Sequence, residues 1–192
     1  MIIYLTRHGE SIFNVKKLLG GNSGLSPKGI SYSVKLFEYF KENNMIANLN
    51  LMTSNMLRTQ MTAQHFPKIT KSFDFINEID AGIFDSKSAE YIKNNNINEY
   101  QLRKNDKFNY IYPQGESYRM LQKRVLKILD HLEDNKINLV VCHNAVLRVI
   151  YAHFNKISND MMPHLEIPLH TLFYLKIEDG QVIESNMIPL IE

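Results

Sequence analysis

Short apolar runs alternate along the chain with stretches whose apolar residues recur every three or four positions. The runs are typical of buried strands, whereas the spacing of three or four is typical of amphipathic helices. The pattern predicts strands at residues 2–6, 49–53, 139–142, 171–177 and 182–188. The strongest amphipathic stretch runs from Tyr118 to Leu132 and predicts a helix.

Further helices are predicted between these strands. Ser26 and Pro27 supply an N-cap and a first-turn proline, so a helix is expected to begin there. Helices are also expected at residues 55–66 and 145–154, each after a strand. Residues 83–108 are polar and weakly periodic, and we expect short helices there in an inserted flap.

The order of these elements indicates the fold class. Strands that alternate with helices predict an α/β three-layer sandwich, in which a mostly parallel central sheet carries helices on both faces. No internal repeat or linker divides the sequence, so residues 1–192 are expected to form one domain. Ligands bind such sheets at the carboxyl ends of the strands. Arg7-His8-Gly9 and His143-Asn144 directly follow predicted strands, which places both at that edge.

Composition narrows the classes of partner and compartment. The chain is 44% hydrophobic, enough for a substantial core, and its net charge of +2 is too balanced to indicate nucleic-acid binding. No apolar run approaches the roughly 18 residues of a membrane span, and the N-terminus lacks the features of a signal peptide. We therefore expect a cytoplasmic protein with no nucleic-acid or membrane partner. The single cysteine, Cys142, is expected to be a buried strand residue.

Arg7-His8-Gly9 is the first candidate for chemistry. A histidine that ends a strand can present one ring nitrogen to a cleft, and Gly9 allows the backbone to approach an anion closely. A nearby cation such as Arg7 lowers the pKa of the imidazole and favours its neutral, nucleophilic form. For an isolated tripeptide, a histidine satisfied by a backbone hydrogen bond is the simpler interpretation. Other candidate residues elsewhere in the chain favour the interpretation that His8 is a nucleophile.

Four further residues suit phosphate chemistry. Asn14 can donate an amide hydrogen to a phosphate oxygen, and His143 closes the third strand as His8 closes the first. Arg58 lies in the first turn after the second strand, where helix N–H groups and a guanidinium suit a phosphate. Glu78 is a lone carboxylate before a glycine turn. Taken singly, Arg58 is a surface charge and Glu78 a helix cap or a surface residue.

Together these residues predict phosphoryl transfer: a nucleophilic histidine, cations for the phosphoryl oxygens, and an acid for the leaving group. A metal site is the alternative for the same histidines. No His-x-x-x-His pair or Asp/His cluster has ligand spacing, so no metal and no cofactor are expected.

Longer motifs carry a resemblance to a known family. They are Arg7-His8-Gly9-Glu10-Ser11, residues 20–26, Asn77-Glu78-Ile79-Asp80-Ala81-Gly82, residues 112–118, residues 141–148 and Pro168-Leu169-His170-Thr171. From about Leu5 to Leu175 the chain resembles the histidine phosphatase (phosphoglycerate mutase-like) superfamily. More narrowly, it is similar to the bisphosphatase half of 6-phosphofructo-2-kinase/fructose-2,6-bisphosphatase. The Arg-His-Gly element is shared across the superfamily, whereas the stretches at residues 78–82, 112–118 and 168–171 are more specific.

The resemblance implies a role for each matching residue. It implies that His8 is the phosphorylated nucleophile and that Glu78 is the general acid, which later activates water. It implies a phosphate clamp of Arg7, Asn14, Arg58 and His143, with backbone help near Gly20. It implies a second pocket, for the 6-phosphate of a sugar, at Arg103, Lys107, Tyr118, Asn144 and Arg148.

Two positions depart from the family pattern. Asn144 stands where the bisphosphatases carry a glutamine, and Ala89 stands where they carry a tyrosine that contacts the sugar phosphate. We expect a phosphatase that acts through a phosphohistidine on a phosphorylated small molecule such as fructose 2,6-bisphosphate. The alternatives are a phosphoglycerate mutase, a broad-specificity phosphatase, and a phosphosite-binding module, which would be expected to lack His8 or Glu78. The sequence carries no indication of oligomeric state.

Overall fold

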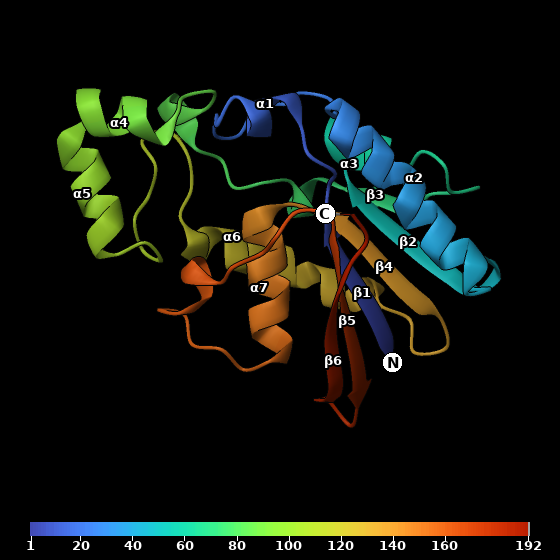
Figure 1. Cartoon of the computed structure of the whole chain (residues 1–192). Coiled ribbons are helices and arrows are strands. Elements are labelled where there is room, and N and C mark those ends of the chain that lie inside the picture. The colour runs from blue at the N-terminus through green and yellow to red at the C-terminus, as the bar shows by residue number, and fades with distance from the viewer. Residues whose placement is uncertain (192) are drawn as a thin grey trace.

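Six strands form one central sheet in the computed structural model, which describes residues 1–191 (Figure 1). Their bounds are β1 (Ile2–Arg7), β2 (Leu49–Ser54), β3 (Lys71–Phe73), β4 (Ile137–Cys142), β5 (Thr171–Glu178) and β6 (Gln181–Pro189). They lie in the order β3-β2-β4-β1-β5-β6. The first four are parallel to one another, and β5 and β6 are added by antiparallel pairing. The prediction of a mostly parallel sheet is therefore confirmed.

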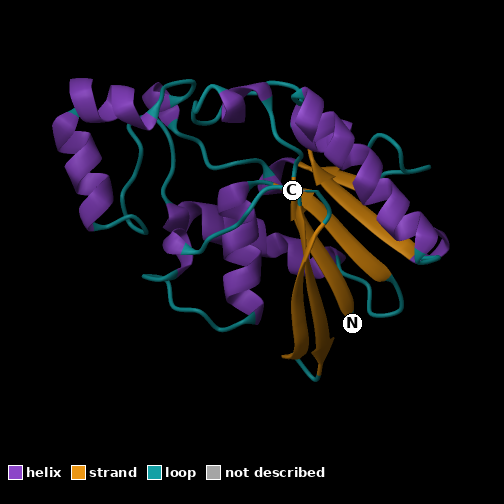
Figure 2. Cartoon of the chain, viewed as in Figure 1, coloured by secondary structure: helices purple, strands orange, loops and turns teal. Residues whose placement is uncertain are grey.

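Helices cover both faces of this sheet (Figure 2). Their bounds are α1 (Ile12–Val15), α2 (Pro27–Glu42), α3 (Leu57–Ala63), α4 (Ala89–Asn95), α5 (Ile97–Asn105), α6 (Tyr118–Val125) and α7 (Asn144–Phe154). Short 3-10 turns lie at Ile46–Asn48, Asp74–Ile76, Gly82–Phe84, Leu126–His131 and Met162–His164. Residues of α2 and α3 pack on one face of the sheet, and residues of α6 and α7 pack on the other. The predicted three-layer α/β sandwich is confirmed.

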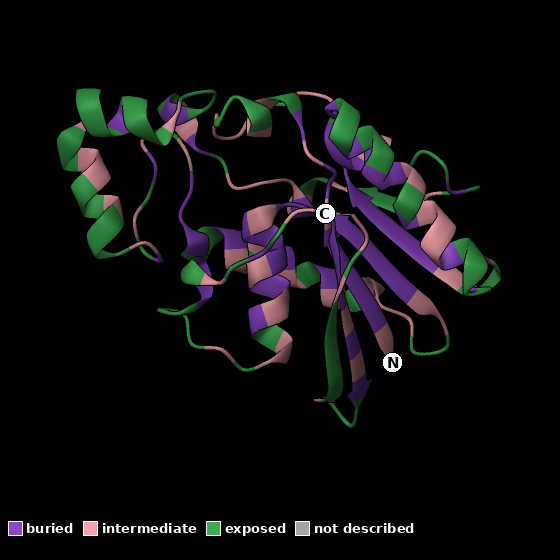
Figure 3. Cartoon of the chain, viewed as in Figure 1, coloured by how far each residue is buried: buried purple, intermediate pink, exposed green. Residues whose placement is uncertain are grey.

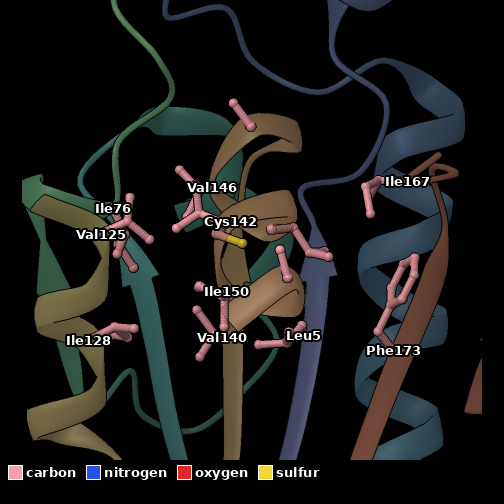
Figure 4. Packing of buried hydrophobic residues seen from close by; sticks show 14 of the residues in the cluster. Leu5, Ile76, Val125, Ile128, Val140, Cys142, Val146, Ile150, Ile167 and Phe173 are labelled. Atoms are coloured by element: carbon pink, nitrogen blue, oxygen red, sulfur yellow. The ribbon is translucent and has the colours of Figure 1, made fainter. Parts of the chain in front are cut away.

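The central strands are mostly apolar because each one packs against helices on both sides. In β4, Leu139 and Val141 belong to the core beneath α2, whereas Val140 and Cys142 belong to the core beneath α7. Successive strand residues point to opposite faces, so a strand buried on both faces needs a continuous apolar run. Figure 4 shows Val140 and Cys142 among the α7 residues Val146 and Ile150. Cys142 is fully buried, as predicted.

Residues 83–108 form the predicted flap. They contain α4 and α5, which confirms the expectation of short helices in this segment. The two helices stand at one end of the molecule, away from the strands (Figure 1), and most of their surface is exposed (Figure 3). Among residues 1–191, no helix is long and apolar enough to cross a membrane.

Several boundaries differ from the predictions. The helix expected over residues 118–132 is α-helical only to Val125 and continues as a 3-10 helix to His131. The sequence did not predict this change, because the apolar spacing does not distinguish the two kinds of helix. The helix expected over residues 55–66 is shorter, at Leu57–Ala63. Two elements were not predicted. One is β3, which has three residues and pairs only with β2, and the other is the four-residue α1.

The loop after β1 touches the first turn of α2 through two glycines. A Cβ atom at Gly29 would lie 2.1 Å from the carbonyl oxygen of Glu10, and one at Gly9 would lie 2.5 Å from the carbonyl oxygen of Gly29. Both neighbours are backbone atoms, so no side-chain rotation relieves either clash. This contact fixes the chain directly after His8.

Gly29→Ala is expected to destabilise the protein by about 1–3 kcal/mol, because the added methyl group forces the two backbones apart. For a chain of this size, each kcal/mol lowers Tm by about 2–4 °C. Thermal unfolding followed by circular dichroism measures the effect. Ser31→Ala, at an exposed position of the same helix, is the control and is expected to leave Tm within about 1 °C. Equal Tm values for the two variants would show that the glycine contact is loose.

Candidate active site

Three neighbouring strands end at one place on the sheet. β1 is followed directly by His8, β4 by His143, and β2 ends with Ser54. β4 lies between β1 and β2 and is parallel to both, so their carboxyl ends meet at one edge. The rings of His8 and His143 lie with their centroids 5.2 Å apart. The structure thus brings together the two histidines that the sequence placed at this edge.

One hydrogen bond sets the tautomer of His8. Its Nδ1 atom lies 2.7 Å from the carbonyl oxygen of Gly9, and because a carbonyl only accepts, Nδ1 carries the proton. In the neutral ring, Nε2 is then the atom with the free lone pair. The side chain is only 3% exposed. Burial holds the pKa of His8 well below its usual value, with Arg58 and Arg7 adding to the effect.

His143 is fully buried beside His8. Its Nε2 atom shares a hydrogen bond of 2.7 Å with the hydroxyl of Ser54. Its Nδ1 atom has no hydrogen-bond partner among the described residues. Burial is the main reason that the pKa of His143 is also well below its usual value, followed by the charge of Arg58. Both rings are therefore neutral at pH 7.

Two arginines flank the histidines. Arg7 donates from one terminal nitrogen to the carbonyl of Ile167 at 2.7 Å, and its buried Nε has no partner among the described residues. Arg58 is 3% exposed and donates to the carbonyl of Gly21 at 2.6 Å. Burial lowers the pKa of Arg7 to about 10, against the opposing effect of Glu78, and it lowers the pKa of Arg58 as well. Both guanidinium groups stay charged at neutral pH.

Glu78 lies where this site meets a second pocket. Its Oε1 atom accepts hydrogen bonds from the backbone N–H groups of Ile79 at 2.9 Å and Ala145 at 3.2 Å. Ala145 is in the first turn of α7, and free N–H groups at a helix start favour a carboxylate. Glu78 also lines a cavity of about 100 Å³. One carboxylate oxygen is thus held by the backbone, at the wall of this cavity.

The cavity joins Glu78 to most of the predicted second pocket. Its lining includes Gly20, Arg103, Tyr118, Asn144 and Arg148. Arg148 donates to the hydroxyl of Tyr118 at 2.9 Å and to the carbonyl of Leu165 at 2.7 Å. The Oδ1 atom of Asn144 is buried and has no partner among the described residues.

Lys107 of the predicted second pocket and Asn14 of the predicted phosphate clamp do not belong to that lining. Lys107 donates to the carbonyl of Pro163 at 2.6 Å, and burial together with Arg148 and Arg103 lowers the pKa of Lys107 to about 8. Its ammonium group therefore belongs to the same cationic cluster. Asn14 uses its Oδ1 atom to accept from the backbone and hydroxyl of Ser11 at the start of α1. Within residues 1–191, no hydrogen bond or cavity links Asn14 to the histidines.

Sequence reasoning missed several supporting residues. Tyr112, 5% exposed, accepts a hydrogen bond of 2.6 Å from Arg103 and lies under its guanidinium. Asp85 accepts from Gly21 at 2.8 Å and braces the Gly20 loop, where φ is +58° and a Cβ atom would lie 1.7 Å from the Asp85 carboxylate. Tyr112 stands in a recognised motif, which is a signal for it. Asp85 is in no motif, and only the folded chain brings it to the loop.

The two buried histidines have a consequence for stability. In the unfolded chain they take up protons as the pH falls through about 6.5, whereas in the folded chain they stay neutral to a much lower pH. The unfolded state then binds more protons, so the free energy of unfolding decreases as the pH falls below about 6.5. Each histidine contributes a slope of at most about 1.4 kcal/mol per pH unit.

His8→Asn and His143→Asn are each expected to reduce this slope, because each removes one group that protonates only on unfolding. Urea unfolding of the parent and the variants at several pH values between about 7.5 and 5 measures it. His65→Asn, at an exposed position, is the control and should keep the parent slope. Parent-like slopes in both buried-histidine variants would contradict the inferred protonation states.

Known proteins share sequence with most of this chain. Residues 3–187 match the sequence model of the histidine phosphatase superfamily (branch 1). The chain is 41% identical over 174 residues to a fructose-2,6-bisphosphatase of Saccharomyces cerevisiae, which covers 91% of this chain and 38% of that protein. It is 40% identical over 184 residues to human 6-phosphofructo-2-kinase/fructose-2,6-bisphosphatase 4, covering 95% of this chain and 39% of that protein. The chain thus spans less than half the length of these relatives.

Solved structures with low sequence identity share the fold. A putative alpha-ribazole-5'-P phosphatase from Escherichia coli has a TM-score of 0.79 at 20% identity, over 98% of this chain and 96% of that one. A mycobacterial glucosyl-3-phosphoglycerate phosphatase has a TM-score of 0.80 at 16% identity, over 98% of each chain. The family match over residues 3–187 and the relatives at about 40% identity show that this chain belongs to the histidine phosphatase superfamily.

Proposed function

We propose that this chain is a phosphatase that transfers the phosphoryl group of a phosphomonoester to Nε2 of His8 and then to water. The observation that carries the proposal is the hydrogen bond from Nδ1 of His8 to the carbonyl of Gly9. It leaves Nε2 unprotonated in a ring that burial and two arginines keep neutral. A neutral imidazole beside fixed cations is suited to attack phosphorus, and the cations stabilise the charge of the transferred group.

Three buried polar atoms without partners support binding of a phosphate and of a substrate that carries a hydroxyl group. Among the described residues, the buried side-chain nitrogens and oxygens without a partner are Arg7 Nε, His143 Nδ1 and Asn144 Oδ1. Buried polar groups are nearly always hydrogen-bonded, so these three call for a ligand. Arg7 Nε donates to a phosphate oxygen, and so does His143 Nδ1 when Ser54 donates to Nε2 of that ring. Asn144 Oδ1 only accepts, which suits a substrate hydroxyl.

Glu78 is proposed to move the protons. The negative charge of the bound phosphate favours uptake of a proton by the Glu78 carboxyl. In the first step, the bond from Nε2 of His8 to phosphorus forms, the bond from phosphorus to the leaving oxygen breaks, and the carboxyl gives this proton to that oxygen. In the second step, the carboxylate takes a proton from water as the water oxygen attacks the phosphohistidine. Phosphate leaves and His8 is restored. A positioned carboxyl group typically contributes about 10²–10⁴-fold to such a step.

The substrate is proposed to carry two anionic groups, as fructose 2,6-bisphosphate does. Arg7 and Arg58 serve the phosphate at His8. Arg103, Lys107 and Arg148 form a second cationic cluster, of which Arg103 and Arg148 line the same cavity as Glu78. The relatives at about 40% identity are named fructose-2,6-bisphosphatases, which supports this substrate and does not favour a mutase. The presence of both His8 and Glu78 does not favour a module that only binds phosphosites.

The phosphohistidine can be trapped. Brief incubation with a labelled phosphoester, followed by denaturation, is expected to give a phosphoprotein that is labile in acid and stable in base. His8→Ala is expected to abolish both the label and turnover, because it removes Nε2, the atom that takes the phosphoryl group. His131→Ala, which changes a half-buried histidine stacked on Phe73 away from the site, is the control and should keep the label. Full turnover by His8→Ala would refute the mechanism.

The second cluster can be tested by substrate comparison. Arg103→Ala and Lys107→Ala are each expected to lower kcat/KM for fructose 2,6-bisphosphate about tenfold or more, because a charge-assisted hydrogen bond is worth about 1.5–3 kcal/mol. Neither should change kcat/KM for p-nitrophenyl phosphate by more than about twofold. Lys104→Ala, at an exposed position next to Arg103, is the control for loss of charge. If both variants treat both compounds as the parent does, the bisphosphate assignment falls and the phosphatase assignment stands.

A further inference from the structure

Arg124, near the end of α6, has all five of its N–H groups engaged around the Glu78 segment. One terminal nitrogen donates to the carbonyls of Phe75 and Asn77, both at 2.8 Å. The other donates to the carbonyl of Glu78 at 3.0 Å and to Oε1 of Glu116. Nε donates to Oε2 of Glu116 at 3.0 Å. A guanidinium has five donors in a rigid plane, and here each of them meets an acceptor.

Glu116 extends this contact to the far side of Glu78. Its carboxylate, besides pairing with Arg124, accepts from the backbone N–H of Asp80 at 3.0 Å. Its own backbone N–H donates to the carbonyl of Asp80 at 3.0 Å. The ion pair is mostly buried, with 24% of the Arg124 side chain and 12% of the Glu116 side chain exposed. The backbone is therefore tied at Glu78 itself and at residues on both sides of it.

We propose that Arg124 and Glu116 are positioning residues: they fix the backbone of Glu78 so that its carboxyl group reaches the leaving oxygen. The inference rests on the proposed function, in which Glu78 is the acid. Neither side chain supplies a nucleophile or a phosphate contact in that function, since the guanidinium is taken up by three carbonyls and one carboxylate. Their effect on the reaction passes through the backbone of Glu78.

The geometry explains why a small displacement matters. The Glu78 carboxylate is held at one oxygen by Ile79 and Ala145, so the direction of the side chain depends on where its backbone lies relative to α7. A misplacement of about 1 Å at a reacting group costs on the order of 10²-fold in rate. A lysine at position 124 has a compact ammonium group, which cannot span the same acceptors in one plane.

The test uses Arg124→Met, Arg124→Lys and Glu116→Gln, with Glu78→Gln as the reference. Phosphoenzyme formation is followed by rapid quench with fructose 2,6-bisphosphate, whose leaving oxygen needs a proton, and with p-nitrophenyl phosphate, whose leaving oxygen does not. Arg124→Met is expected to slow the first reaction about 10- to 100-fold and the second less than about threefold. KM for the bisphosphate should stay within about threefold, since the second cationic cluster is untouched. Arg124→Lys should recover part of the loss.

Two comparisons separate positioning from a general loss of structure. Arg119→Met removes an arginine from the same helix that donates to Asn109 and not to the Glu78 segment, and it is expected to leave both rates unchanged. In the double variant Arg124→Met with Glu78→Gln, the second change should add less than about twofold, because residues that act through one group are not additive. A purely structural role would instead lower both rates together and add to the Glu78→Gln loss.

Different outcomes refute the positioning role of Arg124 and Glu116 and the role of Glu78 as the acid. If Glu78→Gln shows the dependence on the leaving group and Arg124→Met and Glu116→Gln do not, the positioning role is refuted while the phosphatase mechanism stands. If Glu78→Gln itself slows both substrates equally, the assignment of Glu78 as the acid fails, and the positioning role fails with it. Should Arg124→Met not fold, Arg124→Lys and Glu116→Gln decide the question by the same ratio of rates.

Discussion

The hydrogen bond from Nδ1 of His8 to the carbonyl of Gly9 is the contact on which the rest of the site depends. It selects one tautomer and leaves the opposite nitrogen for the substrate. The carbonyl can do so only if the chain after β1 is fixed. Gly9 donates to the hydroxyl of Thr62 at 2.9 Å, and its Cα lies against Gly29 of α2. The protonation state of one ring thus depends on close packing between the strand-end loop, α2 and α3.

Electrostatics gives the second constraint. Burial lowers the pKa of Arg7 and of Arg58, so the folded chain holds two guanidinium charges at a point where charge is costly. Glu78 offsets part of this cost, since its charge opposes the pKa shifts of Arg7 and Arg58. A phosphate dianion would offset more of it and would place a negative charge near the same carboxyl group. The electrostatic cost of the buried charges is therefore lower when the site holds an anion than when it is empty.

The sequence predicted the parts of the site that depend on local pattern, and it missed those that depend on contacts between distant segments. His8 and His143 were placed at one edge because each follows an apolar strand, and the parallel sheet confirms that arrangement. Arg124 could not be recognised, because its acceptors at residues 75–78 lie more than 45 positions away and are backbone carbonyls, which every residue has. β3 was missed for a similar reason, since three residues carry no periodicity.

The arrangement separates the proposed chemistry from the proposed choice of substrate. His8 and His143 follow buried strands, and Arg58 is buried in α3, so their positions are determined by the core. Arg103 lies in α5 and Lys107 follows that helix, in the exposed flap that stands away from the sheet (Figure 3). Arg148 in α7 and Arg103 of the flap line one cavity, with Glu78 on its wall. A substrate with two phosphates would have to touch both the core and the flap. Changes in the flap, such as Ala89, can then alter which second group is accepted without moving the nucleophile.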